Sequence, residues 1–266
     1  MYRKIKKLYN IRKRITIALF LREAKSRFGN NKFSLMWALL EPIFQVGIFA
    51  IIFLALKKQG PHGSDVFTFL IPGIIIFQIF SKVFARCMDA IDANKTLLSY
   101  PIMKPFDTIL ARALLEFIIY NIIFLFFIYF LFYYEFIEKI YRFDFMILPI
   151  SLAFIMGLSL GTFIAALSSL FNSITKIVGV INRFLFLSSG IFFSASMLPQ
   201  FAREILWWNP LLHLTEMIRY SLIEGFPEKH FSVMYVSFWT LSALAIGLLM
   251  LHLAERNPNA KIRGVA

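Results

Sequence analysis

Long apolar runs separated by short polar stretches dominate the chain. Six runs are long enough to suggest transmembrane helices, at Ser34–Leu56, Phe67–Phe84, Ile109–Tyr133, Phe145–Phe171, Ile177–Phe193 and Phe231–Leu253. A helix needs about 20 apolar residues to cross the hydrocarbon core of a bilayer, and these runs are continuous rather than alternating. The second and fifth are the shortest. The pattern therefore predicts an all-α membrane protein with six transmembrane helices.

The first thirty residues have a different pattern. Apolar residues recur there at three- and four-residue steps between basic ones, at Leu8, Ile11, Ile15 and Leu19. This period is typical of an amphipathic helix that lies in the membrane interface, although a basic arm that only fixes topology is the alternative. Gly29, followed by two asparagines, is expected to end the helix. We therefore divide the chain into an interface helix, 1–30, and a six-span domain, 31–266.

A polar stretch, 87–107, separates the second and third apolar runs. We expect a short helix there from Asp92 to Ser99, lying across the ends of the spans with Asp92 as its N-cap. Pro101 and Pro105 would end this helix and redirect the chain into the next span.

The distribution of charge fixes the expected orientation. The chain has 28 Lys and Arg residues against 15 Asp and Glu, a net charge of +13. With six spans, 19 of the basic residues fall on the side of both termini and 7 on the other side, and the remaining two, Arg112 and Arg183, lie within the spans. Because basic loops stay inside, both termini are predicted to be cytoplasmic. The excess charge then lies where anionic lipid attracts it, which disfavours nucleic-acid binding.

Several ionisable residues fall within or beside the spans. Arg112 and Glu116 are four residues apart at the start of the third span, and a mutual ion pair is expected. Arg183 lies in the fifth span. It could pair with Glu41 or Glu116 or reach the inner surface, or it could contact a phosphate or acidic glycan, and both alternatives stay open. Trp37 is expected near the inner headgroups.

The segment 194–230 is too polar to cross a membrane and too apolar to be a free loop. Pro199 and Pro210 divide it into two expected helices, Gln200–Trp208 and Leu211–Glu224. We predict a re-entrant hairpin in the outer leaflet that rims a passage, because irregular backbone at that depth needs protein or water beside it.

The sequence lacks several motifs that mark phosphate-binding or catalytic sites. It has no GxxxxGK[ST] phosphate loop, no HExxH and no GxSxG. A single cysteine, Cys87, excludes an internal disulfide and a multi-cysteine metal site. We expect neither an enzyme nor a metal site. If transport is active, its energy comes from another subunit; an ATP-independent transporter or channel and a membrane scaffold are the alternatives.

Three segments together resemble a known family. They are LFLREAKSRFGNNKFSLMWALLEP, AIDANKTLLSYPIMKPFDTILARALLE and WWNPLLHLTEMIR. They are similar to the membrane permeases of bacterial capsular polysaccharide exporters, which are ABC-2 type permeases related to O-antigen and teichoic acid exporters. The resemblance covers nearly the whole chain. The segment 32–35 departs from it, because the family usually has a glycine and a tyrosine before the tryptophan.

The resemblance implies a homodimer in the bacterial inner membrane, docked on a separate cytosolic ABC ATPase that binds ATP and magnesium. This chain would need no cofactor. The substrate would be a lipid-linked capsular polysaccharide, passed on to periplasmic and outer-membrane export components. An O-antigen or teichoic-acid exporter is the alternative.

The resemblance and the residue pattern also assign expected roles. Residues expected to contact the ATPase, in a coupling helix at about Asp89–Tyr100, are Asp89, Asp92, Asn94, Lys95, Tyr100 and Lys104. Residues of the gate or interface helix are Arg22, Glu23, Arg27, Phe28 and Gly29. Candidates for the pore or substrate path are Arg183, Trp37, Glu41, Arg112 and Glu116. The outer hairpin contributes Trp207, Trp208, Asn209, Pro210, His213 and Glu216. Aromatic rings that could stack on sugars, or equally face lipid or core, are Phe44, Phe53, Tyr120 and Phe163.

Overall fold

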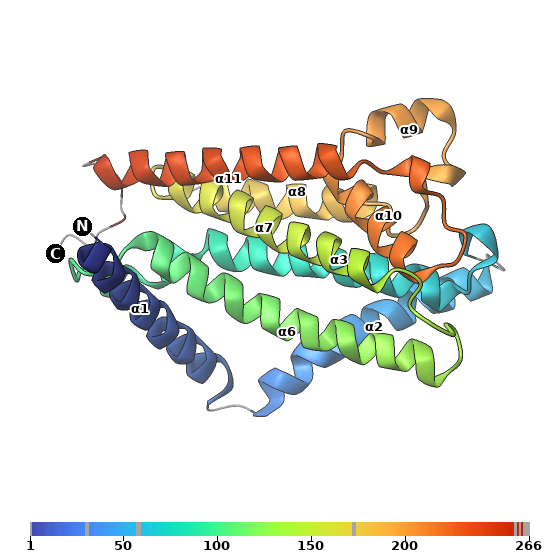
Figure 1. Ribbon diagram of the computed structural model, residues 1–266, viewed down its shortest axis with the longest axis horizontal. Coiled ribbons are helices and arrows are strands. Elements are labelled where there is room, and N and C mark those ends of the chain that lie inside the picture. Colours follow the sequence, from blue (N-terminus) through green and yellow to red (C-terminus); the bar gives the residue numbers. More distant parts are fainter. Residues whose placement is uncertain are drawn as a thin grey trace.

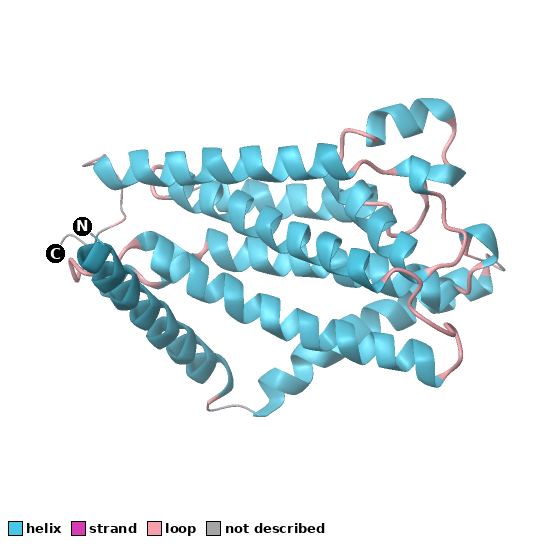
Figure 2. Ribbon diagram, viewed as in Figure 1, coloured by secondary structure: helices cyan, strands magenta, loops and turns pink. Residues whose placement is uncertain are grey.

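The computed structural model describes residues 2–29, 32–56, 60–171, 174–257, 260 and 262, and it places no strand among them (Figures 1 and 2). Within these ranges, five helices are long and apolar enough to cross a membrane. They are α2 (Lys32–Ala55), α3 (Val66–Met88), α6 (Pro105–Tyr133), α7 (Phe143–Ser168) and α11 (Val233–Arg256). The prediction of an all-α protein with several membrane-spanning helices is confirmed, with five candidate spans among the described residues.

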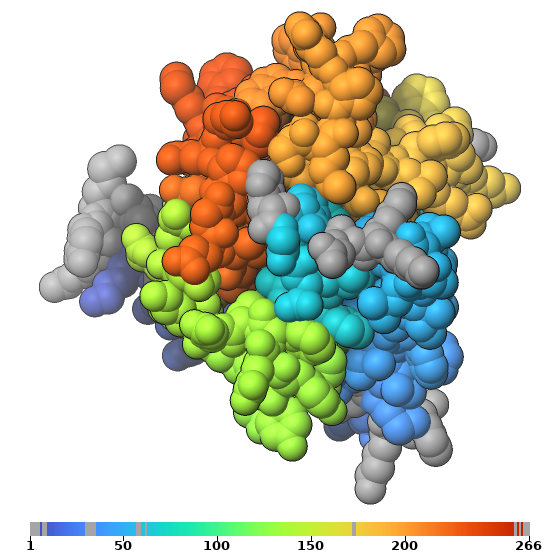
Figure 3. Space-filling model, turned by 90° about the vertical axis from the view of Figure 1, so that its right-hand side faces the viewer, coloured from blue at the N-terminus to red at the C-terminus, as the bar shows by residue number. Residues whose placement is uncertain are grey.

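The helices form an elongated bundle with two distinct ends (Figure 1). One end, here called the basic end, carries helix α1, residues 89–104 and the last turn of α11. The opposite end, here called the hairpin end, carries residues 60–65, 134–142 and 189–232 and faces the viewer in Figure 3. The first and last helices therefore meet at the same end.

Helix α3 forms the centre of the bundle and is buried along most of its length. It packs on α7 through two glycines at a four-residue spacing, a pattern that lets helix backbones approach closely. A Cβ atom on Gly157 would lie 2.7 Å from the Phe80 carbonyl oxygen, and one on Gly161 would lie 2.3 Å from Cys87 Cβ. These glycines therefore set the distance between the two helices.

Helix α1 (Tyr2–Phe28) lies obliquely across the basic end and packs on α6 (Figure 1). Among the residues of the predicted apolar face, Ile11 and Ile15 are partly buried and Leu19 is buried. The side chain of Leu8 lies outside the described part.

The first helix ends where the sequence predicts. Its last helical residue is Phe28, and the Gly29 N–H donates to the Lys25 carbonyl oxygen at 2.7 Å. The two asparagines that follow Gly29 lie outside the described residues.

The fifth predicted helix is shorter than expected. Helix α8 (Ile174–Ser188) has 15 residues and ends five residues before Phe193. The chain turns at Gly190, whose φ of 76° is a left-handed conformation that favours glycine. At 1.5 Å per residue the helix is about 22 Å long, less than the ~30 Å hydrocarbon core.

The hairpin between α8 and α11 contains the two predicted helices with different bounds. They are α9 (Gln200–Leu206) and α10 (Pro210–Leu222), flanked by the 3-10 turns η2 (Ala195–Met197) and η3 (Glu228–His230). The first ends earlier than Trp208 because Asn209 caps the second, accepting the Leu211 N–H at 3.1 Å. Pro210 then occupies the first helical position, where a missing N–H is tolerated.

Candidate functional site

The coupling segment, residues 89–104, forms two one-turn helices instead of the single predicted one. They are α4 (Ala90–Ala93) and α5 (Lys95–Leu98), and the break falls at Asn94. The expectation that Asp92 is an N-cap is wrong, because Asp92 lies inside α4. Pro105 begins α6, as predicted for a residue that redirects the chain.

The coupling segment has an apolar underside and a charged outer face. Ala90, Ile91 and Leu98 are buried in the core at the basic end. Asp92 and Lys95 are exposed and form an ion pair of 2.8 Å. The other exposed side chains predicted to contact an ATPase are Asp89, Tyr100 and Lys104. The coupling segment is therefore packed against the bundle on one side and exposed at the surface on the other.

Asn94 differs from the other predicted contact residues, because only 3% of it is exposed. Its amide nitrogen donates to the Ala90 carbonyl oxygen at 2.9 Å, and its amide oxygen accepts a hydrogen bond from Arg22 of α1. The side chain thus faces the first helix rather than the outside, and it joins that helix to the coupling segment.

Four polar contacts, here called the latch, hold α1 against the coupling segment and α6. They are Arg12–Asp107, Arg22–Asn94, Glu23–Arg112 and Arg27–Glu116. The first is a 2.7 Å ion pair, and Arg12 also donates to the Ile102 carbonyl oxygen at 2.9 Å. Because these contacts recur along α1, a movement of this helix would also displace the coupling segment.

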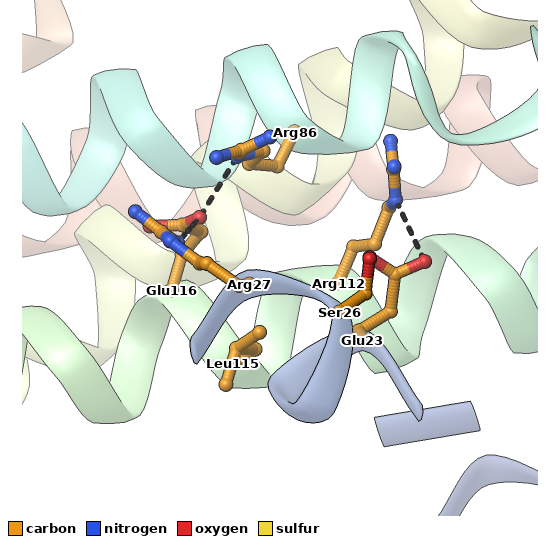
Figure 4. Close-up of a pocket in the computed structure, with 7 residues that line it drawn as sticks. All are labelled: Glu23, Ser26, Arg27, Arg86, Arg112, Leu115 and Glu116. Atoms are coloured by element: carbon orange, nitrogen blue, oxygen red, sulfur yellow. Dashed lines mark hydrogen bonds and ion pairs between the residues drawn. The ribbon is translucent and has the colours of Figure 1, made fainter. Parts of the chain in front are cut away.

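The predicted ion pair between Arg112 and Glu116 is wrong. Glu116 instead binds Arg27 of α1 and Arg86 of α3, the second at 2.9 Å. Arg112 Nε lies 3.3 Å from Glu23 Oε1 (Figure 4). Both residues prefer partners on other helices because α1 packs across this face of α6 and brings charges of both signs to it.

The latch borders a cavity of about 240 Å³ between α1, α3 and α6 (Figure 4). Its lining residues are Glu23, Ser26, Arg27, Arg86, Arg112, Leu115 and Glu116. Three guanidinium groups face two carboxylates there, so the cavity carries a net positive charge. Glu116 Oε2 is buried and has no hydrogen-bond partner within the described chain. A charged cavity of this kind, at the end of an apolar bundle, suits a polar or anionic group.

The other candidates for a substrate path lie apart from the latch. Glu41 forms an ion pair with Lys82 of α3, so neither Glu41 nor Glu116 is the partner of Arg183. Arg183 is exposed and forms no ion pair with a described residue. Trp37 is 64% exposed.

The aromatic candidates are divided between surface and core. Phe53 and Tyr120 are buried in the core, so neither is available to stack on a sugar. Phe44 is exposed and Phe163 is partly buried.

The gate-helix candidates not yet placed lie at the end of α1. Phe28 is partly buried against the core, with the Arg27 guanidinium 5.5 Å from its ring centre. Gly29 is exposed at the helix end.

The hairpin between α8 and α11 is held by a buried ion pair that the sequence did not predict. Arg219 and Glu216 are both fully buried on α10, with Nη1 3.3 Å from Oε1. Arg219 also donates to four carbonyl oxygens, those of Phe69, Gly190, Ile191 and Phe193. The guanidinium thereby satisfies three carbonyl oxygens in the chain that follows α8 and one on α3. The feature of the sequence that could have indicated this ion pair is the three-residue spacing between Glu216 and Arg219.

The other predicted hairpin residues mark the start of α10. Asn209 donates to the Ser188 carbonyl oxygen at 3.0 Å, which ties the hairpin to the end of α8. Trp208 is exposed, and Trp207 packs edge-on against His213 with 4.5 Å between ring centres. The two tryptophans thus have different surroundings.

His213 is buried in one tautomer. The Ser232 N–H donates to Nδ1 at 3.1 Å, so the ring proton lies on Nε2 and is donated to the Trp207 carbonyl oxygen at 2.8 Å. Burial lowers the pKa of His213, which favours the neutral ring that these two bonds require.

Acidification should therefore destabilise the wild type more than a His213→Gln variant. The pKa of His213 is lower in the folded chain than in the unfolded chain, where it is about 6.5, so the unfolded state binds the proton first. Stability is then lost as pH falls below about 6.5. Thermal unfolding of the detergent-solubilised protein between pH 8 and pH 5 measures this. The exposed His252→Gln variant should follow the wild type, and identical pH slopes for all three proteins would contradict the assignment.

Reversing one charge of the latch should weaken it, and reversing both should restore it. Glu23→Arg places a second guanidinium beside Arg112 and should cost about 1–3 kcal/mol of stability. Adding Arg112→Glu should recover most of this loss, with an interaction energy of about 0.5–3 kcal/mol. Unfolding midpoints of the single and double variants measure the coupling. Lys25→Glu, on the exposed side of α1, is the control, and a double variant no more stable than Glu23→Arg would argue against the pairing.

Comparison with known proteins identifies the family. The model of the ABC-2 type transporter family matches residues 15–223. The polysialic acid transport protein KpsM of Escherichia coli is 32% identical over 247 residues, which cover 93% of this chain and 96% of that protein. The capsule polysaccharide export inner-membrane protein BexB of Haemophilus influenzae is 26% identical over 240 residues, covering 90% of this chain and 91% of that protein. CtrC of Neisseria meningitidis serogroup B, which has the same description, is 25% identical over 240 residues, with the same coverage. The match of the family model over most of the chain shows that this protein belongs to the ABC-2 type transporter family.

Proposed function

We propose that the chain is the inner-membrane permease of an ABC exporter of capsule polysaccharide. The observation that carries this proposal is similarity over at least 90% of the chain to three proteins named for capsule or polysialic acid export. A lipid-linked polysaccharide would cross from the cytoplasm and pass to periplasmic and outer-membrane components.

The proposed orientation places the basic end in the cytoplasm with both termini. This end carries the latch and the coupling segment. The excess of basic residues in the segments at this end supports the cytoplasmic orientation. Helix α8 would be the sixth span. Although it is short, it runs from the basic end toward the hairpin end (Figure 1). The outer hairpin would then enter the outer leaflet, where Arg219 satisfies its irregular backbone.

The proposed energy source is a separate ATPase that binds ATP and magnesium. The sequence of this chain has no phosphate loop, and its coupling segment presents a charged face at the basic end. The latch would transmit movement of that segment to α1, the proposed gate helix. In this scheme Arg112 and Glu116 act in the latch.

The proposed assembly is a homodimer. Helices α2 and α8 are weakly packed on the rest of the bundle and expose large apolar side chains. A second copy that covers this face would enclose a path between the two subunits.

Deletion of the chain from its host tests the function. We expect lipid-linked polysaccharide to accumulate inside the cell and surface capsule to disappear, and a plasmid copy of the chain should restore it. Co-purification with the ABC ATPase encoded in a neighbouring reading frame, followed by measurement of ATP hydrolysis, tests the partnership. Unchanged surface polysaccharide after deletion would overturn the proposal.

A further inference from the structure

Four polar side chains meet midway along three apolar helices. This cluster, here called the amide stripe, consists of Gln45 on α2, Gln78 and Ser81 on α3, and Asn182 on α8. Gln78 donates a hydrogen bond to Gln45 Oε1, and Asn182 Nδ2 donates to Ser81 Oγ at 2.7 Å. Because Gln78 and Ser81 are three residues apart, they share one face of α3. The stripe therefore joins α2 and α8 to the same face.

Two acceptors of the amide stripe have no partner. Gln78 Oε1 and Asn182 Oδ1 are buried, and neither accepts a hydrogen bond from any described residue. Such groups are costly in an apolar interior. Asn121 on α6 lies outside the stripe, and its amide nitrogen donates to the Phe117 carbonyl oxygen of its own helix at 2.7 Å. The stripe therefore leaves two buried acceptors unsatisfied within the described part of the chain.

The stripe occupies the middle of a longer face of α2. Trp37, Glu41, Gln45 and Phe49 follow one another at four-residue steps, so their side chains lie along one side of the helix. Toward the basic end, Glu41 is paired with Lys82 of α3. The amides thus follow a charged layer at mid-depth of the bundle.

An aromatic layer lies beyond the amides, toward the hairpin end. Phe49 packs against Phe186 of α8 and against Phe192, with ring centres 5.9 Å and 4.5 Å apart. Both α2, in blue, and the yellow chain of α8 reach the same side of the hairpin end in Figure 3. The face between α2 and α8 therefore changes from charged to amide to aromatic along the length of the bundle.

We propose that the amide stripe binds hydroxyl groups of the glycan during its passage. This inference rests on the proposed function. Sugar hydroxyls are neutral donors and acceptors, and they match the unpaired amide oxygens better than lipid chains do. Neutral hydrogen bonds also suit a moving polymer, because a transport path must bind strongly enough to admit a substrate and weakly enough to release it.

Replacement of the amides tests the contact. Gln78→Met and Asn182→Leu are close to the native residues in volume and remove the unsatisfied acceptors, but they also remove the donors to Gln45 and Ser81. Because these effects oppose each other, thermal stability should change by no more than about 1 kcal/mol. Export of capsule polysaccharide should be slowed about tenfold, the factor expected for the loss of one hydrogen bond. Asn121→Leu is the control and should export at the wild-type rate. Wild-type rates in both stripe variants would overturn the inference, whereas a wild type that exports no glycan would overturn the proposed function instead.

Thiol labelling tests the same site without an export assay. In the assembled complex, Gln45→Cys should react with a charged, water-soluble thiosulfonate if the stripe borders a wet passage. Ile122→Cys is the matched control, because Ile122 is 59% exposed on α6 and would face lipid, where the thiolate does not form. Native Cys87 is fully buried and should not contribute. A cysteine at position 45 as unreactive as the one at position 122 would count against the proposal.

Discussion

Replacing Arg219 with methionine should lower the free energy of unfolding by about 3–5 kcal/mol, a large effect for one side chain. The guanidinium is fully buried and lies 3.7 Å from the centre of the Phe69 ring. Its removal leaves the Glu216 carboxylate buried without its cation. It also leaves carbonyl oxygens unpaired where α8 ends, of which the closest, that of Gly190, accepts at 2.7 Å.

The two parts of this effect can be separated. Adding Glu216→Gln to Arg219→Met removes the isolated carboxylate, so the double variant should recover part of the lost stability but not all, because the carbonyl oxygens remain unpaired. Denaturant unfolding in detergent measures both variants. Arg256→Met, at the exposed end of α11, is the control and should change stability by no more than about 0.5 kcal/mol. An Arg219→Met protein as stable as this control would show that the buried pair contributes nothing.

The sequence predicted the long helices because each is a local pattern. A continuous apolar run indicates a helix that is buried in lipid or protein. Asn209 followed by Pro210 indicates the start of a helix. Neither inference depends on the position of the rest of the chain. The end of α8 was missed for the same reason. Residues 189–193 continue the apolar run, and only the packing of α10 under Gly190 shows that the helix has stopped: a Cβ there would lie 2.4 Å from Leu212 Cδ1.

The site was predicted less well because its partners are distant in sequence. The spacing of Arg112 and Glu116 indicates a local pair, but Arg27 is 89 residues from Glu116 and reaches it only after α1 has packed on α6. The segment 194–230 is too polar to cross a membrane, and nothing in its local pattern predicts that Arg219 is fully buried. Its burial depends on carbonyl oxygens freed at the end of α8, which no local pattern shows.

Inverting the exposed charges of the coupling segment should separate the permease from its proposed ATPase partner without unfolding it. Asp92→Lys combined with Lys95→Glu keeps an opposite-charge pair at a three-residue spacing, so stability should change by less than about 1 kcal/mol. Any surface that complements the native charges would then face like charges, which costs several kcal/mol at an interface. We expect affinity for the ATPase to fall at least ~100-fold, about 2.7 kcal/mol, and surface capsule to disappear.

Binding of the purified ATPase to the permease in detergent measures this effect, and unfolding midpoints verify that the variant is folded. The matched control is a second charge inversion at the basic end, Glu255→Arg with Arg256→Glu, since both residues are exposed at the end of α11. This control should bind the ATPase as the wild type does, because only the coupling segment is proposed to dock. If the coupling variant binds and exports normally, the docking surface lies elsewhere. If both inversions abolish binding, the ATPase binds through charges across the whole basic end and not through this segment alone.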